Sequence, residues 1–310
     1  MRNTGLDVAR LIAMAFVAVQ HALSVCDIES PRLFSKLDLG QLGVVVFFSI
    51  SGYLAVQKGD TKPISWLRKR LSRIFVPYWV TLTGVLIANH YQAYKPISLP
   101  LVLSEYLGVA GWTHRGELIG VHFWFISLLL FCYVIAAIIR ACPVSFPVIV
   151  LATVGWIWYE PHYAGCTLAF LTGIGFGKIS TSPSLVGISA AAVGAMLLGQ
   201  LCNSAFSCVA VAAGSLGSLS IPWKVSRQNA CKIADASNMS YHFYLVHGPV
   251  YLAVALFVSP KLWSVLSLGT FIAVSVAIVL RNTETAIRYW TSHLSDFVQK
   301  KKPVNQRDSG

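Results

Sequence analysis

The feature that most constrains this chain is a series of long apolar segments that recur along most of its length. About 20 mostly apolar residues can span a bilayer, and they do so as a helix because hydrocarbon offers no partners for backbone N–H and C=O groups. Charged residues make up only 12% of the chain, about half of what a soluble protein carries. We therefore expect an all-α, polytopic membrane helix bundle of about ten transmembrane helices, at residues 7–26, 39–57, 75–90, 119–139, 145–160, 163–179, 184–202, 205–221, 239–258 and 262–280.

Two further stretches have a mixed character. Residues 96–113 are apolar but contain Pro96, Pro100 and Glu105, a pattern that predicts an interfacial or re-entrant piece. Residues 281–310 begin with an amphipathic pattern and end in polar residues, which predicts a cytoplasmic, amphipathic and then disordered tail. The transmembrane domain should therefore comprise residues 1–280.

The net charge of +12 reflects topology, in our interpretation. When the N-terminus is assigned to the inside, most Lys and Arg residues fall in the segments that face the same side as the two ends. Cytoplasmic loops of membrane proteins carry this excess of positive charge. We therefore expect both termini in the cytoplasm and no nucleic-acid partner.

The seven cysteines lie mostly within apolar segments. The sequence contains no Cys-x-x-Cys pair and no Cys/His spacing typical of a zinc site. We interpret them as small apolar side chains packed between helices, and we expect no metal site.

The first segment contains Arg10 and His21, which are ionisable residues at membrane depth and therefore functional candidates. Eleven residues of helix bring them to within about 20° of the same face and about 16 Å apart along the axis. They cannot touch each other, but they could contact two ends of one elongated ligand. The alternatives are that Arg10 extends to the interface and pairs with Asp7, and that His21 is a neutral core histidine.

The next elements supply a polar notch and a basic cluster. Ser51 lies beside Gly52 in the second segment, although small residues also occur at ordinary helix contacts in membranes. Arg70 and Arg73 fall in the loop expected before the third segment, three residues apart and on one face. Two guanidiniums so placed can grip a phosphate, whereas the plain alternative is a topology signal.

Later segments add aromatic and histidine candidates. His122 and Trp124 open the fourth segment near the outer boundary, where an aromatic-belt role explains Trp124 but not His122. In the ninth segment Tyr244 and His247 share a face. His242 and His247 are five residues apart, so they do not form the pair of a helical metal site. A structural hydrogen-bond network is an equally good interpretation of this group.

These elements, in this order, resemble the membrane acyltransferase-3 family. GLDVARLIA with Arg10 and His21 resembles its opening signature, and FFSISGYL resembles its second-helix motif. Arg70-Leu71-Ser72-Arg73 resembles the family's Arg-x-x-Arg element. HFWFISLLLFCY and YHFYLVHGP resemble its later blocks. The resemblance implies that residues 1–280 form an O-acyltransferase of cell-surface polysaccharides in the bacterial inner membrane.

The resemblance further implies a reaction and its participants. An acyl group, most often acetyl, would pass from acyl-coenzyme A, a substrate rather than a resident cofactor, to a hydroxyl of a glycan or glycan precursor. Arg70 and Arg73 would bind the donor phosphates, with Arg10 nearby, and His21 would act as general base or carry the acyl group. Ser51, Tyr244 or a backbone N–H would stabilise the oxyanion.

This mechanism leads us to expect one continuous tunnel along the face of the first helix, from Arg10 to His21. A proton-coupled transporter or flippase of a glycan or lipid intermediate is the alternative, because such bundles also bury His and Arg. A non-catalytic subunit of a polysaccharide assembly complex is the third possibility. Consumption of acyl-coenzyme A distinguishes the first possibility from the other two.

Overall fold

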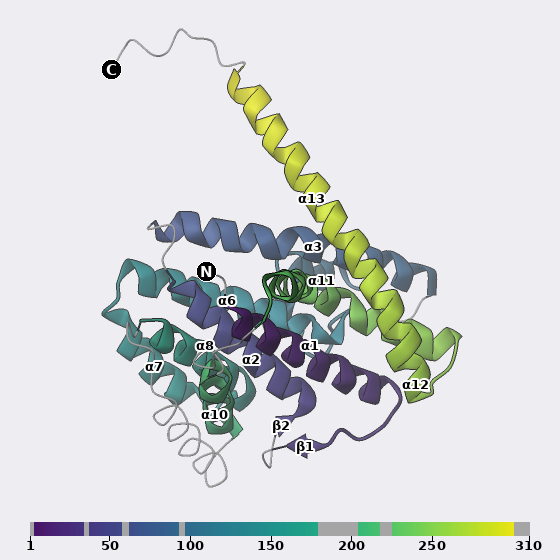
Figure 1. Cartoon of the computed structure of the whole chain (residues 1–310), viewed down its shortest axis with the longest axis horizontal. Coiled ribbons are helices and arrows are strands. Elements are labelled where there is room, and N and C mark those ends of the chain that lie inside the picture. Colours follow the sequence, from purple (N-terminus) through teal and green to yellow (C-terminus); the bar gives the residue numbers. More distant parts are fainter. Residues whose placement is uncertain are drawn as a thin grey trace.

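The computed structural model describes residues 3–33, 37–57, 62–92, 97–178, 204–217 and 225–300. Within them the chain is a bundle of helices (Figure 1). The first half contains α1 (Thr4–Val25), α2 (Leu39–Ala55), α3 (Pro63–Gln92), α4 (Leu99–Tyr106), α5 (Ala110–Thr113), the 3-10 turn η1 (Val121–Phe123) and α6 (Trp124–Ala141). The second half contains α7 (Ser145–Trp156), α8 (Pro161–Lys178), α10 (Ser204–Gly217), α11 (Arg227–Phe257), α12 (Leu262–Ser264), the π-helical turn η3 (Val265–Gly269) and α13 (Thr270–Lys300).

The predicted apolar segments coincide with helices wherever the structure describes them. The segment at 184–202 lies outside the described residues. Four described helices are long and apolar enough to cross a membrane, at Thr4–Val25, Pro63–Tyr91, Val121–Ala141 and Leu262–Thr291. The chain is therefore a membrane protein, while the number of ten spans and the cytoplasmic placement of the termini stay predictions.

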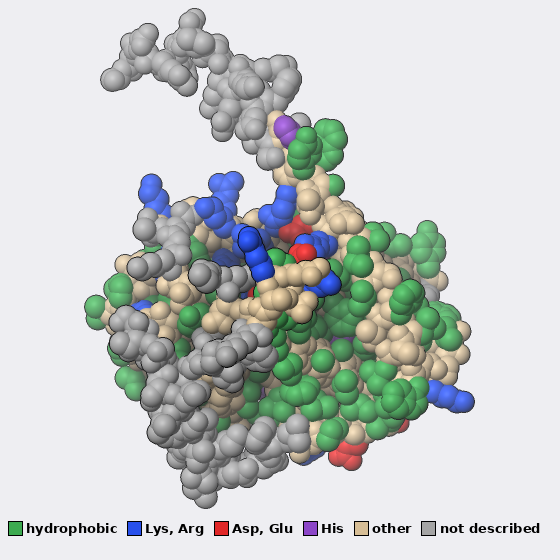
Figure 2. All heavy atoms as spheres, viewed as in Figure 1, with side chains coloured by type: hydrophobic (Ala, Val, Ile, Leu, Met, Phe, Trp, Pro, Cys, Tyr) green, Lys and Arg blue, Asp and Glu red, His purple; other side chains and the backbone are tan. Residues whose placement is uncertain are grey.

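Two helices are longer than the apolar pattern predicted. The basic residues 68–73, expected in a loop, lie in the first part of α3, which runs unbroken through Pro77. The amphipathic segment after residue 280 continues the apolar helix α13 instead of forming a separate element. Figure 1 shows α13 projecting beyond the bundle, and Figure 2 shows Lys and Arg side chains gathered where it leaves. Polar sequence therefore extends the spanning helices instead of ending them.

The segment at 96–113 folds into α4 and α5, which turn at Gly108 with a φ of +70°. Glu105, only 1% exposed, holds this piece against the bundle. One carboxylate oxygen accepts a hydrogen bond from the Tyr78 hydroxyl at 2.8 Å, and the other accepts one from the backbone N–H of Ile119 at 3.1 Å. Glu105, which interrupts the apolar pattern of this segment, therefore forms buried hydrogen bonds that attach α4 to the bundle just before η1.

Helix α2 occupies the centre of the bundle, between α1 and the pair α8 and α10. Its short hairpin, β1 (Arg32–Leu33) with β2 (Leu37–Asp38), ends in a capping box that Asp38 and Gln41 form at the start of α2. Glycines then let α2 approach its neighbours at backbone distance. A Cβ at Gly52 would collide with the carbonyl of Phe170, and one at Gly173 would collide with the carbonyl of Ser49.

Replacement of either interface glycine by alanine should separate α2 from α8. We expect Gly52→Ala and Gly173→Ala each to cost about 1–3 kcal/mol of folding free energy, the range typical of overpacking. Thermal unfolding of the detergent-solubilised protein measures this. Gly84→Ala in α3 is the matched control because a Cβ there meets no atom within 4 Å, so this variant should be as stable as the parent or slightly more stable. Equal midpoints for all three variants would contradict the interlock.

Candidate active site

Two cavities lie among the candidate residues. The larger of the two, which we call the arginine cavity, encloses about 460 Å³ between α1, α2, α3, α6, α11 and α13. Four guanidiniums line it, together with one carboxylate. They belong to Arg10, Arg70, Arg73, Arg288 and Glu284. Because positive charge exceeds negative charge by three at this wall, the cavity attracts anions.

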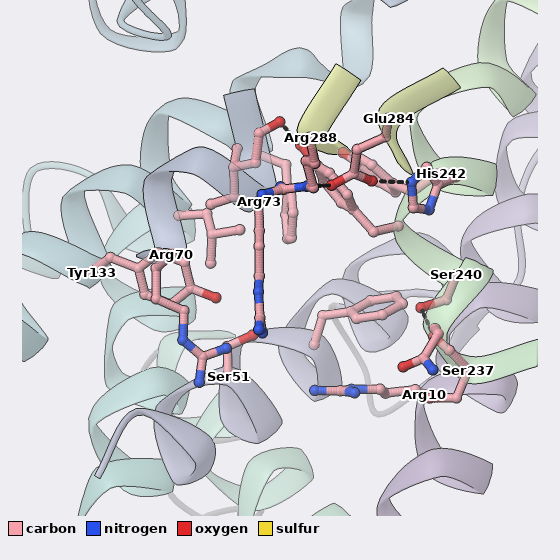
Figure 3. Close-up of a pocket in the computed structure, with 17 residues that line it drawn as sticks. Arg10, Ser51, Arg70, Arg73, Tyr133, Ser237, Ser240, His242, Glu284 and Arg288 are labelled. Atoms are coloured by element: carbon pink, nitrogen blue, oxygen red, sulfur yellow. Dashed lines mark hydrogen bonds and ion pairs between the residues drawn. The ribbon is translucent and has the colours of Figure 1, made fainter. Parts of the chain in front are cut away.

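Arg10, Arg70 and Arg73 extend toward one another from two helices (Figure 3). Arg70 and Arg73 share a face of α3 because they are three residues apart. The Arg70 guanidinium donates to the carbonyl of Leu54 at 3.4 Å, near the C-terminus of α2, where a positive charge is favoured. Ser51 lies one turn earlier on α2 and lines the same cavity. Arg73 is exposed, so the cavity is open to the outside at this residue.

A partly buried ion-pair network closes the far wall of the arginine cavity. Glu284 on α13 accepts from Nε2 of His242 on α11 at 2.7 Å and pairs with Arg288 at 2.6 Å. Arg288 in turn donates to the carbonyl of Ser72 at 2.9 Å, between the two cavity arginines of α3. The network therefore ties α11 and α13 to the turn of α3 that carries Arg70 and Arg73.

A second cavity of about 210 Å³, which we call the histidine cavity, lies toward the N-terminus of α2. His21 of α1, His122 of η1 and His162 of α8 contribute their rings to its wall. Trp124 lines it too, stacked on Tyr163 with 5.6 Å between the ring centres. The other polar residues at this wall are Gln20, Asp38, Gln41 and Tyr244.

Three imidazoles form a cluster beside this cavity, and two of them, His21 and His122, line it. The His21 ring lies 4.9 Å from that of His247 and 5.7 Å from that of His122, and the latter two are 5.4 Å apart. His247 donates from Nδ1 to the carbonyl of Tyr244 at 2.7 Å, so in the neutral ring Nε2 is an acceptor. That Nε2 atom is buried and has no hydrogen-bond partner among the described residues. His21 thus packs against two imidazoles that the protein backbone orients.

The His122 ring can pack against α11 only because residue 248 is a glycine. A Cβ at Gly248 would lie 2.8 Å from both Cε1 and Nδ1 of that ring. The Nε2 atom of His122 donates to the carbonyl of Leu245, 3.3 Å away. His122 therefore packs directly onto the backbone of α11.

The expected single tunnel is absent from the described part of the chain. Arg10 lines the arginine cavity and His21 lines the histidine cavity, although both lie on the same side of α1. Tyr244 contributes to the walls of both cavities. Its hydroxyl, expected as an oxyanion donor, donates instead to the carbonyl of His122 at 2.6 Å. A packed aromatic side chain therefore interrupts the route that the sequence suggested.

All nine candidate residues from the sequence lie in or next to the two cavities. The arginine cavity contains Arg10, Ser51, Arg70 and Arg73, and the histidine cavity contains His21, His122 and Trp124. Tyr244 lines both, and His247 packs against His21. Residues from six separate elements thus gather within one region of the bundle.

Sequence analysis missed the residues that support this region. Glu284 and Arg288 were assigned to a surface tail, although their spacing of four is that of a helical ion pair. His242 was excluded as half of a helical metal pair and placed in a possible hydrogen-bond network, but its carboxylate partner on another helix was not identified. Asp38 and Gln41, three residues apart at the start of an apolar segment, match a capping pattern that was not used.

Comparisons with known proteins identify the family of this chain. A family model described as an acyltransferase domain matches residues 3–282. An O-acetyl transferase of Shigella phage Sf6 is 38% identical over 71 residues, which is 22% of this chain and 21% of the relative. The chain thus aligns with about a fifth of that curated relative. No solved structure matches.

Loss of Glu284 should destabilise the protein because it leaves His242 and Arg288 without their shared carboxylate. We expect Glu284→Ala to lower the free energy of unfolding by about 1–3 kcal/mol, the cost of leaving a largely buried polar group without its partner. The control is Glu160→Ala, which removes the exposed pair with Arg115, whose side chains are 47% and 41% accessible, and should cost under about 1 kcal/mol. Chemical or thermal unfolding in detergent compares the two, and an equal loss would contradict a structural role for the network.

Proposed function

Because this chain belongs to the acyltransferase-3 family, we propose that it is an integral membrane O-acyltransferase. It moves an acyl group, in the simplest case acetyl, from acyl-coenzyme A to a hydroxyl of a cell-surface glycan or glycan precursor. We place it in the bacterial cytoplasmic membrane as a multi-pass protein with the arginine cavity on the cytoplasmic side. The observation that carries the proposal is the succession of a guanidinium-lined cavity and an imidazole-lined cavity along α1.

The arginine cavity suits the donor. Coenzyme A carries phosphates, and guanidiniums bind phosphate oxygens through paired N–H donors. Arg70 and Arg73 project from one face of α3, with Arg10 opposite them. Four guanidiniums that repel one another also gain free energy when an anion enters. The long pantetheine arm then extends from this cavity to its boundary with the histidine cavity at Tyr244.

The histidine cavity suits a polyhydroxylated acceptor. Gln20 Oε1 is a buried acceptor with no hydrogen-bond partner among the described residues, and a ligand hydroxyl can supply the donor. Asp38 and Gln41 add further polar groups, and Trp124 offers an aromatic surface. A sugar ring presents hydroxyls at its edge and C–H groups on its faces, which match these two kinds of wall. At about 210 Å³ the cavity is below the range of drug-sized ligand sites and fits a single ring.

His21 is the residue we propose as general base. It removes the proton of the acceptor hydroxyl as the oxygen attacks the thioester carbon. The new C–O bond forms, the C–S bond breaks, and the proton from His21 passes to the departing thiolate. In a two-step variant, the imidazole itself takes the acyl group first. His122 and His247, fixed through the backbone of α11, orient the His21 ring.

Acyl transfer differs from the alternative functions because it consumes acyl-coenzyme A. A flippase or proton-coupled transporter needs no acyl-coenzyme A, and a non-catalytic subunit is inert when purified alone. Membranes incubated with radiolabelled acetyl-coenzyme A should place label in the glycan fraction only when the chain is present. Label that stays in acetyl-coenzyme A with the intact protein would overturn the proposed reaction.

Removal of His21 should abolish transfer without loss of the fold. We expect His21→Ala to lower label incorporation by about 10²–10⁴-fold, the usual contribution of a general base, with an unchanged thermal midpoint. His90→Ala is the matched control because His90 lies exposed on α3. Retained transfer in the His21 variant would eliminate the mechanism.

The cavity arginines should act on donor binding. Each charge-assisted hydrogen bond contributes about 1.5–3 kcal/mol, so Arg70→Ala and Arg73→Ala should raise the KM for acetyl-coenzyme A by about tenfold or more. Higher salt should weaken binding to the parent more than to the variants. Arg68→Ala is the control on the same helix, since Arg68 is exposed and does not line the cavity. An unchanged KM in both cavity variants would refute the phosphate assignment.

A further inference from the structure

Tyr244 is the only described residue that lines both the arginine cavity and the histidine cavity. It lies in α11, two helical turns after Ser237, another residue of the arginine cavity. Its side chain is only 3% exposed in spite of this double contact. The ring therefore fills the space between the two cavities instead of projecting into one of them.

Tyr244 is held firmly in this position. Its ring lies 4.8 Å from the ring of Phe125, 5.4 Å from that of His122 and 5.6 Å from that of His247. Its hydroxyl donates to the carbonyl of His122 at 2.6 Å, which links α11 to η1. Rotation of the side chain away from this position must break that hydrogen bond. A hydrogen bond, and not a covalent bond, therefore holds the Tyr244 ring in place between the two cavities.

The position of this ring matters for the proposed function, on which the inference rests. Donor phosphates among the arginines and a base at His21 are separated by about 16 Å along α1. The thioester carbon must reach the boundary between the cavities to meet an acceptor oxygen activated by His21. The acyl group leads the donor into this boundary, so Tyr244 is the first obstacle that the acyl chain meets.

We propose that Tyr244 is a specificity-determining residue that limits the transferred acyl group to a short chain and separates the thioester from water in the histidine cavity. A two-carbon group fits beside the ring, whereas each added methylene must displace it and break the bond to His122. The same barrier disfavours hydrolysis. In that side reaction a water oxygen bonds to the thioester carbon, the C–S bond breaks, one water proton goes to the thiolate and the other to solvent, and a carboxylate and free coenzyme A result.

The test compares acetyl-, butyryl- and hexanoyl-coenzyme A as donors. Transfer of radiolabelled acyl groups to the glycan fraction is measured in membranes, and free thiol release without acceptor is measured with the purified chain. In Tyr244→Ala, we expect the rate with hexanoyl relative to acetyl to rise about tenfold or more, because a removed wall admits the added methylenes. Thiol release without acceptor should rise as well. Tyr244→Phe keeps the ring and loses the hydrogen bond to His122, so it should raise both the relative rate with hexanoyl and thiol release, each by less than Tyr244→Ala does.

The control is Tyr251→Phe, which removes a tyrosine hydroxyl bonded to Thr270 at 2.8 Å on the same helix and outside both cavities. It should match the parent in donor preference and in thiol release. If Tyr244→Ala fails to fold, as judged by its thermal midpoint, Tyr244→Phe decides the question. Thiol release equal to that of the parent then overturns the proposal.

The outcomes separate this inference from the proposed function. An intact protein that transfers no acyl group from any donor overturns the proposed function. An active parent with an unchanged donor preference in a folded Tyr244→Ala overturns the role of Tyr244 alone. A folded Tyr244→Ala that is inactive with every donor also overturns it, because the tyrosine would then belong to the reacting groups and not to a barrier.

Discussion

The close approach of α2 to its neighbours is the contact on which both cavities depend. Gly43 lets α2 approach the carbonyl of Ala13 on α1, and Gly52 and Gly173 do the same for the contact with α8. Between lipid-embedded helices there is little hydrophobic driving force, so such van der Waals contact supplies much of the association energy. With α2 fixed in this way, Ser51 near one end and the Asp38 cap at the other reach two separate cavities.

Electrostatics then distinguish the two cavities. The arginine cavity concentrates guanidiniums that the protein tolerates because the carbonyls of Leu54 and Ser72 and the carboxylate of Glu284 each take up part of their charge. The histidine cavity has imidazoles whose orientation the backbone fixes, with Asp38 as its carboxylate. In the reaction we propose, these two environments attract a charged donor and a polyhydroxylated acceptor to different places, and transfer takes place at the boundary between them.

Much of this arrangement follows from the sequence because helical periodicity is a local property. The apolar segments predict the helices, and a separation of eleven residues predicts that Arg10 and His21 share a side of α1. Glu284 was missed because its partner His242 lies 42 residues away in the chain, and only the packing of α13 on α11 joins them. The division between cavities was missed for a similar reason, since it depends on the packing of one side chain, Tyr244, against three other rings.

The contact between Gly248 and the His122 ring also bears on how this chain can vary. The imidazole occupies the volume that any side chain at position 248 would need. The absence of a side chain at Gly248 is thus as necessary for the imidazole cluster as the rings themselves. Substitution at 248 is tolerated only together with a smaller residue at 122, so these two positions, more than 120 residues apart in the chain, are expected to evolve as a pair.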